Sequence, residues 1–81
     1  MTRVISVEFS RPGENGVKSC SVMEGTSVAK AMEQAGMDYN EDKESVFTLD
    51  KEIDEMGDDP VDISENVESG SYVIVTQTES N

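Results

Sequence analysis

The stretch 24–37, EGTSVAKAMEQAGM, constrains the fold most, because it is the one segment with a clear helical period. One apolar stripe runs over two turns at the spacing i, i+3, i+4 and i+7: Val28, Ala31, Met32 and Ala35. A hydroxyl at Thr26 or Ser27 can accept a backbone N–H of the first turn, and Gly36 suits the left-handed residue that ends a helix. A helix of roughly eight residues is not stable alone, so we expect it to pack on a sheet.

Two segments before this stretch, 3–9 and 17–22, alternate apolar and polar residues with the period of a half-buried strand. The residues predicted to face inward are Ile5, Val7 and Phe9 in the first segment, and Cys20 and Val22 in the second. The intervening 10–16, SRPGENG, is rich in turn-forming residues. The pair therefore predicts a β-hairpin.

Three further strands are predicted after the helix. Segment 46–50 is a short strand with Phe47 and Leu49 inward, and 52–54 is a short edge strand. A loop up to residue 68 tucks a few apolar side chains under the sheet. Segment 71–77, SYVIVTQ, is the last strand and has the strongest β propensity.

The predicted order is β-β-α-β-β-β, which indicates a two-layer α+β domain with a mixed sheet and one helix on one face. A right-handed crossover would place the last strand beside the first, in the middle of the sheet. We expect a single domain over 1–77 and a polar tail at 78–81.

The acidic residues are concentrated in one part of the sequence. The formal net charge is −12, and 38–68 holds 13 acidic and 2 basic residues. This charge disfavours direct binding to nucleic acid, whose phosphates would be repelled, and favours a protein partner with a basic surface. The predicted acidic surface consists of Asp50, Asp54, Glu55, Asp58, Asp59 and Asp62.

The inventory of reactive residues is small. Cys20 is the only cysteine and the chain has no histidine, so a zinc site of the usual Cys/His kind and a nucleophile–histidine pair are both excluded. We expect Cys20 to be a small core residue, and we predict no enzymatic activity, metal or cofactor. No apolar run is long enough to span a membrane and no signal peptide is visible, which favours the cytoplasm.

Three phrases resemble a known family when they are read in order: EGTSVAKAMEQAG, VFTLDKEID and NVESGSYVIV. They are similar to the segments around the helix, the third strand and the last strand of the β-grasp sulfur carriers of molybdopterin and thiamin biosynthesis. The resemblance implies a β-grasp, ubiquitin-like fold. Those carriers act through a C-terminal Gly-Gly, whereas this sequence ends in TQTESN and its last glycine, Gly70, precedes the final strand. We therefore expect no carrier chemistry.

The leading hypothesis is a non-enzymatic ubiquitin-like interaction module. Docking through an apolar patch on the sheet is what the resemblance implies, with the acidic surface steering association. The residues predicted to face outward on this patch are Val4, Val46, Tyr72 and Ile74. Two alternatives stay open: an acidic DNA mimic that inhibits a nucleic-acid-binding protein, and a degenerate or truncated sulfur carrier.

Overall fold

The computed structural model describes residues 3–13 and 16–76. Its elements are β1 (Val4–Ser10), β2 (Val17–Met23), α1 (Val28–Ala35), β3 (Glu44–Asp50), β4 (Glu55–Met56) and β5 (Gly70–Thr76). This order confirms the prediction of β-β-α-β-β-β. The predicted tail at 78–81, Gln77 of the last predicted strand and positions 14 and 15 of the predicted turn lie outside the described residues.

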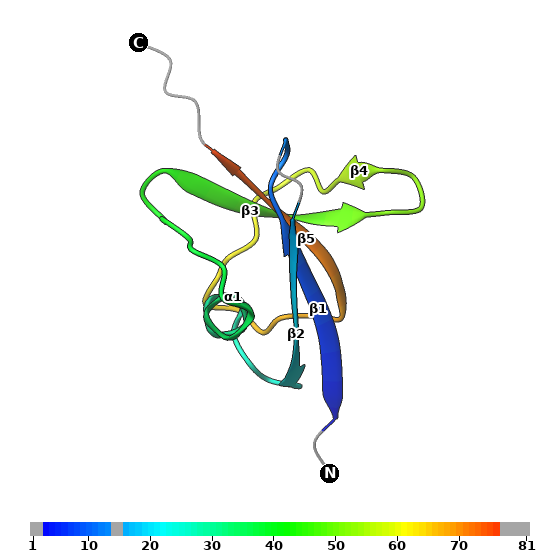
Figure 1. Cartoon of the computed structure of the whole chain (residues 1–81), viewed down its shortest axis with the longest axis vertical. Helices are drawn as coiled ribbons and strands as arrows, with labels where there is room; N and C mark the ends of the chain where they lie inside the picture. Colours follow the sequence, from blue (N-terminus) through cyan, green and yellow to red (C-terminus); the bar gives the residue numbers. More distant parts are fainter. Residues whose placement is uncertain (1–2, 14–15, 77–81) are drawn as a thin grey trace.

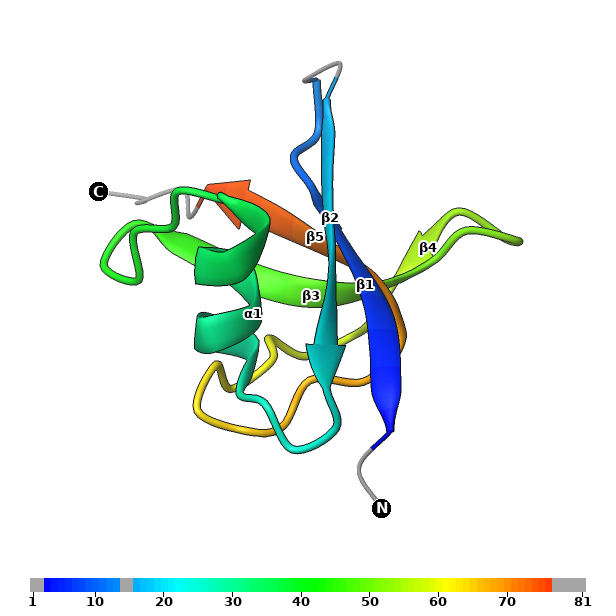
Figure 2. The same cartoon turned by 60° about the horizontal axis from the view of Figure 1, so that its bottom comes forward.

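The five strands form one mixed sheet in the order β2-β1-β5-β3-β4 (Figure 1). β5 runs parallel to β1 and antiparallel to β3, so the last strand lies in the middle of the sheet beside the first, as predicted. α1 lies on one face of the sheet (Figure 2). The chain is therefore an α+β fold in two layers, with the core between α1 and the inner face of the sheet.

Both ends of α1 are closed as the sequence predicts. Ser27 is the N-cap, and its Oγ accepts the backbone N–H of Lys30 at 3.2 Å. Gly36 ends the helix with φ 78°, and the backbone N–H of Met37 donates to the carbonyl of Met32 at 2.9 Å. The stripe residues Val28, Ala31 and Met32 are buried.

The segment between β4 and β5 fastens the helix to the sheet. Its carbonyls at Glu65 and Ile63 accept the backbone N–H groups of Val28 and Ala29, at 2.9 and 3.0 Å. These N–H groups belong to the first turn, which has no partners within the helix. Val61, Ile63 and Val67 pack against the core, which confirms the prediction of apolar side chains tucked under the sheet.

The side chains of β3 and β5 face the opposite way from the prediction. On β5, Tyr72 and Ile74 lie in the core cluster, so Val73 and Val75 lie on the other face. On β3, Val46 is buried opposite Ile74, which turns the neighbouring residues outward. The predictions that Phe47 and Leu49 face inward and that Val46, Tyr72 and Ile74 face outward are therefore wrong.

Pairing with β1 explains the orientation of β5. Phe9 points into the core, as predicted, and Tyr72 is its partner across the parallel pair. The two rings stack with centroids 5.5 Å apart. The Tyr72 hydroxyl accepts the backbone N–H of Glu68 at 3.0 Å, so this polar end is satisfied although the residue is buried.

The short edge strand lies three residues later than predicted. Residues 51–54 form the turn, with Asp54 in the left-handed region at φ 52°, and β4 follows at Glu55–Met56. Aspartate tolerates this backbone conformation better than most residues. The segment after β4 stays along β3, because the N–H groups of Gly57 and Val61 donate to the carbonyls of Thr48 and Val46.

One ion pair ties the end of β1 to the start of β3. Arg11 Nε and Nη2 donate to the two carboxylate oxygens of Glu44 at 3.0 and 3.2 Å, and Nη2 also donates to the carbonyl of Asp38. Both side chains are largely buried, at 21% and 13% exposure. The hydrogen bond from Arg11 lowers the pKa of Glu44 from its usual 4.5.

We predict that Arg11→Ala lowers the free energy of unfolding by about 1–3 kcal/mol at pH 7, because the largely buried carboxylate of Glu44 loses its guanidinium partner while it keeps the hydrogen bond from the backbone N–H of Asn40. A carboxyl group with a lowered pKa stabilises the fold above its unfolded pKa and loses that contribution as the pH falls through its folded pKa. The difference between parent and variant should therefore shrink below pH 4.5, the usual pKa of this carboxyl. Urea unfolding at pH 7 and pH 3 measures both values. Lys30→Ala, which breaks the exposed Lys30–Glu33 pair, is the control and should cost less than about 0.5 kcal/mol.

Candidate functional site

The four residues predicted to form a partner-binding patch do not lie together on the surface. Val46, Tyr72 and Ile74 are at most 4% exposed and belong to the core, so they cannot contact a partner in this fold. Val4 is exposed, at 66%, as predicted. It pairs with Met23 near the start of β1, roughly 20 Å along the strand from Ser10.

The outer face of the sheet, opposite α1, carries a different apolar group. Phe47 pairs directly with Val73 across β3 and β5, and Leu49 and Val75 are the next residues on the same face. Val73 is buried outside the core cluster and the other three are half-buried. We call these four residues the outer-face patch. The exposed Met56 extends it, because it pairs with Leu49.

Beside the patch, the middle of the outer face of β1 and β2 is polar, whereas exposed Val4, Met23 and Val17 lie towards its two ends. Lys51 reaches across to Glu8 on β1, and the Ser71 hydroxyl lies 3.4 Å from the same carboxylate. The hydrogen bond from Lys51 is the main cause that lowers the pKa of Glu8. Ser6, Ser19 and Ser21 follow on the same face of β1 and β2. The outer-face patch therefore has a hydrophilic border towards β1 and β2.

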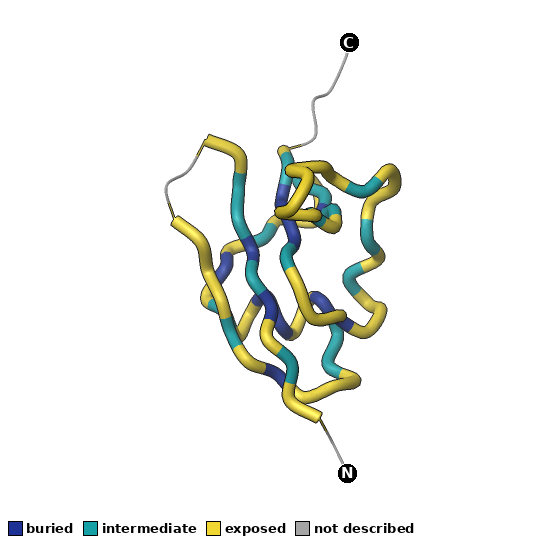
Figure 3. The backbone as a smooth tube through the Cα atoms, turned by 90° about the vertical axis from the view of Figure 1, so that its right-hand side faces the viewer, coloured by how far each residue is buried: buried dark blue, intermediate teal, exposed yellow. Residues whose placement is uncertain are grey.

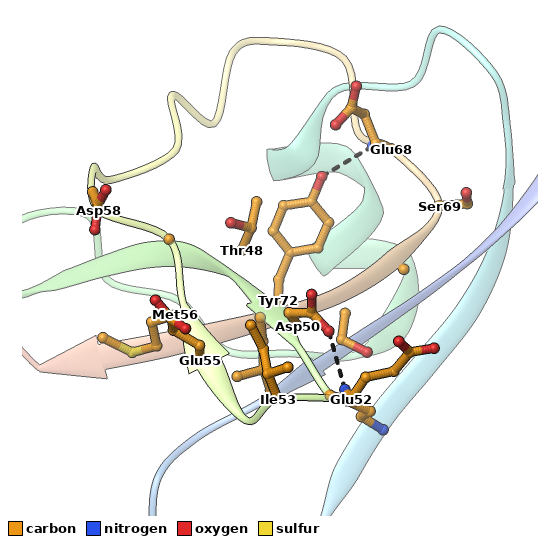
Figure 4. Close-up of a pocket in the computed structure, with 15 residues that line it drawn as sticks. Thr48, Asp50, Glu52, Ile53, Glu55, Met56, Asp58, Glu68, Ser69 and Tyr72 are labelled. Carbon is orange, nitrogen blue, oxygen red and sulfur yellow. Dashed lines mark hydrogen bonds between the residues drawn. The ribbon is translucent and has the colours of Figure 1, made fainter.

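A second surface feature is an open groove of about 760 Å³ between the β3–β4 hairpin and the start of β5 (Figure 4). Thr48 and Tyr72 lie at its centre, with hairpin residues on one side and Glu68 and Ser69 on the other. Its carboxylates are Asp50, Glu52, Glu55, Asp58 and Glu68. We call this feature the acidic groove.

The groove divides the predicted acidic surface into two sets. Asp50, Glu55 and Asp58 line it, whereas Asp54, Asp59 and Asp62 do not. Asp62 instead accepts hydrogen bonds from the backbone N–H and the hydroxyl of Ser64, at 2.9 and 2.7 Å, which lower its pKa. Glu52 and Glu68 were not singled out from the sequence. Glu68 joins the groove because β5 folds back beside the hairpin, a pairing that the local sequence does not reveal.

Most carboxylates of the acidic stretch lie near one of the two ends of β3, whereas Asp62 and Glu65 lie on the segment that fastens α1. The loop that leads from α1 into β3 and the β3–β4 hairpin lie on opposite sides of the molecule (Figures 1 and 2). Exposed positions predominate in these loops, whereas buried positions follow the strands (Figure 3). The charge is therefore not a single lobe. The hairpin end lines the acidic groove, and Asp38 and Glu41 at the other end line a smaller hollow of about 460 Å³ beside α1.

The described residues offer little reactive chemistry. They contain no group of three or more histidine, cysteine or acidic side chains arranged to hold a metal ion. Cys20 faces inward, is half-buried against the core, and its Sγ donates to the carbonyl of Ala31 at 3.4 Å. Burial raises the pKa of this thiol, which keeps it protonated and poorly nucleophilic.

Within residues 3–13 and 16–76, no helix has the length and apolar character needed to cross a membrane. No family model matches the chain, and neither a curated protein nor a solved structure is significantly similar to it. The outer-face patch and the acidic groove are therefore the features of this chain from which a function can be inferred.

Gly57 lets the chain stay close to β3 at the edge of the acidic groove. A Cβ atom added there would lie 2.5 Å from Oγ1 of Thr48, too close for any non-bonded contact. The same glycine donates its backbone N–H to the Thr48 carbonyl at 2.8 Å. This close approach holds the end of the hairpin, and with it the wall of the groove.

We predict that Gly57→Ala lowers the free energy of unfolding by about 1–3 kcal/mol, the usual cost of overpacking. The loss should be much smaller in a Thr48→Ala background, because that change removes the clashing hydroxyl. Gly16→Ala, where a Cβ atom meets nothing within 4 Å, is the matched control. Chemical unfolding of the parent, the three single variants and the double variant measures these losses, and the absence of rescue by Thr48→Ala would contradict the contact.

Proposed function

We propose that this chain is a non-enzymatic interaction module with a ubiquitin-like β-grasp fold, which docks a protein partner through the outer-face patch. The mixed sheet, with its last strand parallel to the first and one helix on one face, is compatible with that fold. The resemblance noted in the sequence supports it independently. A cytoplasmic location is part of the same proposal.

The observation that carries this proposal is the apolar character of both faces of the neighbouring strands β3 and β5. Half-buried Phe47, Leu49 and Val75 surround Val73 on the face away from α1, and no described helix covers them. Isolated exposed apolar residues are ordinary, but a contiguous group is typical of an interaction surface. The direct pair of Phe47 with Val73 makes this group contiguous.

The charge distribution supports a partner with a basic surface. Acidic residues lie in the loops at both ends of β3, and Phe47 of the outer-face patch lies in the middle of this strand. Such flanking charge would attract a basic protein during diffusional encounter and orient it over the apolar contact. The same charge supports a partner other than bare nucleic acid.

We predict that Phe47→Ser and Val75→Ser each reduce recovery of a specific partner by about tenfold, since each removes buried apolar contact from the complex. Affinity purification with quantitative mass spectrometry, run in parallel with the parent protein, measures the recovery. Val4→Ser is the matched control because it removes an exposed valine from the same face far from the patch.

Thermal unfolding should first show that each variant is folded. Recovery of the same proteins by the parent and both patch variants would contradict the proposal. Recovery that falls with salt for all variants alike would instead favour a purely electrostatic partner, as a DNA mimic requires.

A further inference from the structure

The acidic groove combines three features that no other described surface of the chain combines. It is concave, it gathers five carboxylates, and it has exposed apolar side chains at its edge. Ile53 is 63% exposed in the hairpin turn and Met56 is 42% exposed on β4. Neither residue contributes to the core cluster.

We propose that the acidic groove binds a short segment of a protein in which lysine or arginine residues stand next to aliphatic residues. This site adjoins the outer-face patch, because Leu49 and Met56 also line the groove, whereas Phe47, Val73 and Val75 do not. It goes beyond the general attraction of a basic partner, because it commits to direct contact and to the chemistry of the bound segment.

The carboxylates of the groove are available to an incoming cation. Among the described residues, the salt bridges are Arg11–Glu44, Lys30–Glu33 and Lys51–Glu8, and none of them uses a groove carboxylate. Lys51 lines the groove, but its ammonium group turns to Glu8 on the outer face. Carboxylates gathered around a concave surface focus the field, so a cation placed there is attracted by several of them at once.

The apolar side chains explain why the proposed segment carries aliphatic residues as well as positive charge. Ile53 and Met56 lie within a run of acidic residues where solubility alone would favour polar side chains. Lysine and arginine cover apolar surface with their methylene stems while their charged ends reach acidic groups. An aliphatic neighbour in the segment would cover the rest of Ile53.

Other occupants fit the groove less well. A second copy of this chain has a formal charge of −12, so the two grooves and their surroundings would repel each other. Nucleic acid is repelled for the same reason. A divalent metal ion needs converging ligands, and the described residues do not form such a group. A basic peptide needs only spaced carboxylates along a groove, which is the arrangement present.

The mode of contact is through side chains. The edge of β3 that faces away from β5 is already occupied. Leu49 and Asp50 pair with β4, and the carbonyl of Thr48 accepts the backbone N–H of Gly57. A peptide in the groove therefore cannot add as a strand to β3. The sheet edge at this end is β4, which is only 2 residues long, so recognition depends mainly on the carboxylates and on the exposed Ile53 and Met56.

The test uses a blocked nine-residue peptide that alternates lysine and leucine as the probe, titrated into the isotope-labelled full chain. We expect amide shifts confined to the hairpin and to 68–72, and a Kd about tenfold weaker for the double variant Glu55→Gln with Asp58→Asn. The matched control is Glu41→Gln with Asp42→Asn, which removes the same charge at the other end of β3 and should change the Kd less than about twofold. Ile53→Ser should weaken binding about threefold to tenfold, whereas Val17→Ser, at an exposed apolar residue far from the groove, should not.

Three results would overturn the proposal. Equal weakening by the two double variants would mean non-specific attraction to the net charge. Equal affinity for a nine-residue peptide that alternates lysine and serine would mean that Ile53 and Met56 make no apolar contact with the segment. Shifts centred on β2 would mean strand addition at the opposite edge. Phe47→Ser separates the two proposals, because it should leave peptide binding unchanged while it reduces docking at the outer-face patch about tenfold.

Discussion

The position of β5 between β1 and β3 is the constraint on which the rest of the structure depends. A parallel pair with β1 and an antiparallel pair with β3 fix which residues of β5 face α1. Tyr72 stacks on Phe9 and Ile74 lies opposite Val46, so the core is filled from this strand. The same register brings Val73 beside Phe47 on the other face. One strand therefore supplies both the core and the outer-face patch.

The local sequence was sufficient to predict most of the fold. The helical stripe, its caps, the first hairpin and the order of elements are all set by interactions between residues close in sequence. The inward side of β1 was predictable because Ile5, Val7 and Phe9 alternate with polar residues. β5 has no such alternation, because apolar residues run without interruption from Tyr72 to Val75. Its orientation is decided by partners on distant strands, which explains why the predicted facing was wrong.

The candidate sites were less predictable than the fold for the same reason. The sequence indicated a sheet-face patch and an acidic surface, but it named the buried side of β3 and β5 for the patch. Phe47 and Leu49 have the alternation expected of a core-facing strand, yet they lie on the face that α1 leaves open. Such a disagreement between local pattern and final position is expected where a surface has a function as well as a structural role. The acidic groove needed Glu68 and the hairpin to meet, and only the tertiary fold brings them together.

The carbonyl groups of Ile63 and Glu65 accept hydrogen bonds from the first turn of α1, and they therefore join the helix to the segment before β5. If the segment before β5 lifted away, the helix would lose the partners of Val28 and Ala29 as well as its packing on Val67. The helix and the segment that carries Glu68 should therefore open together, as one cooperative unit. Hydrogen exchange at the amide groups of Val28 and Ala29 should therefore report whether that wall of the acidic groove is in place.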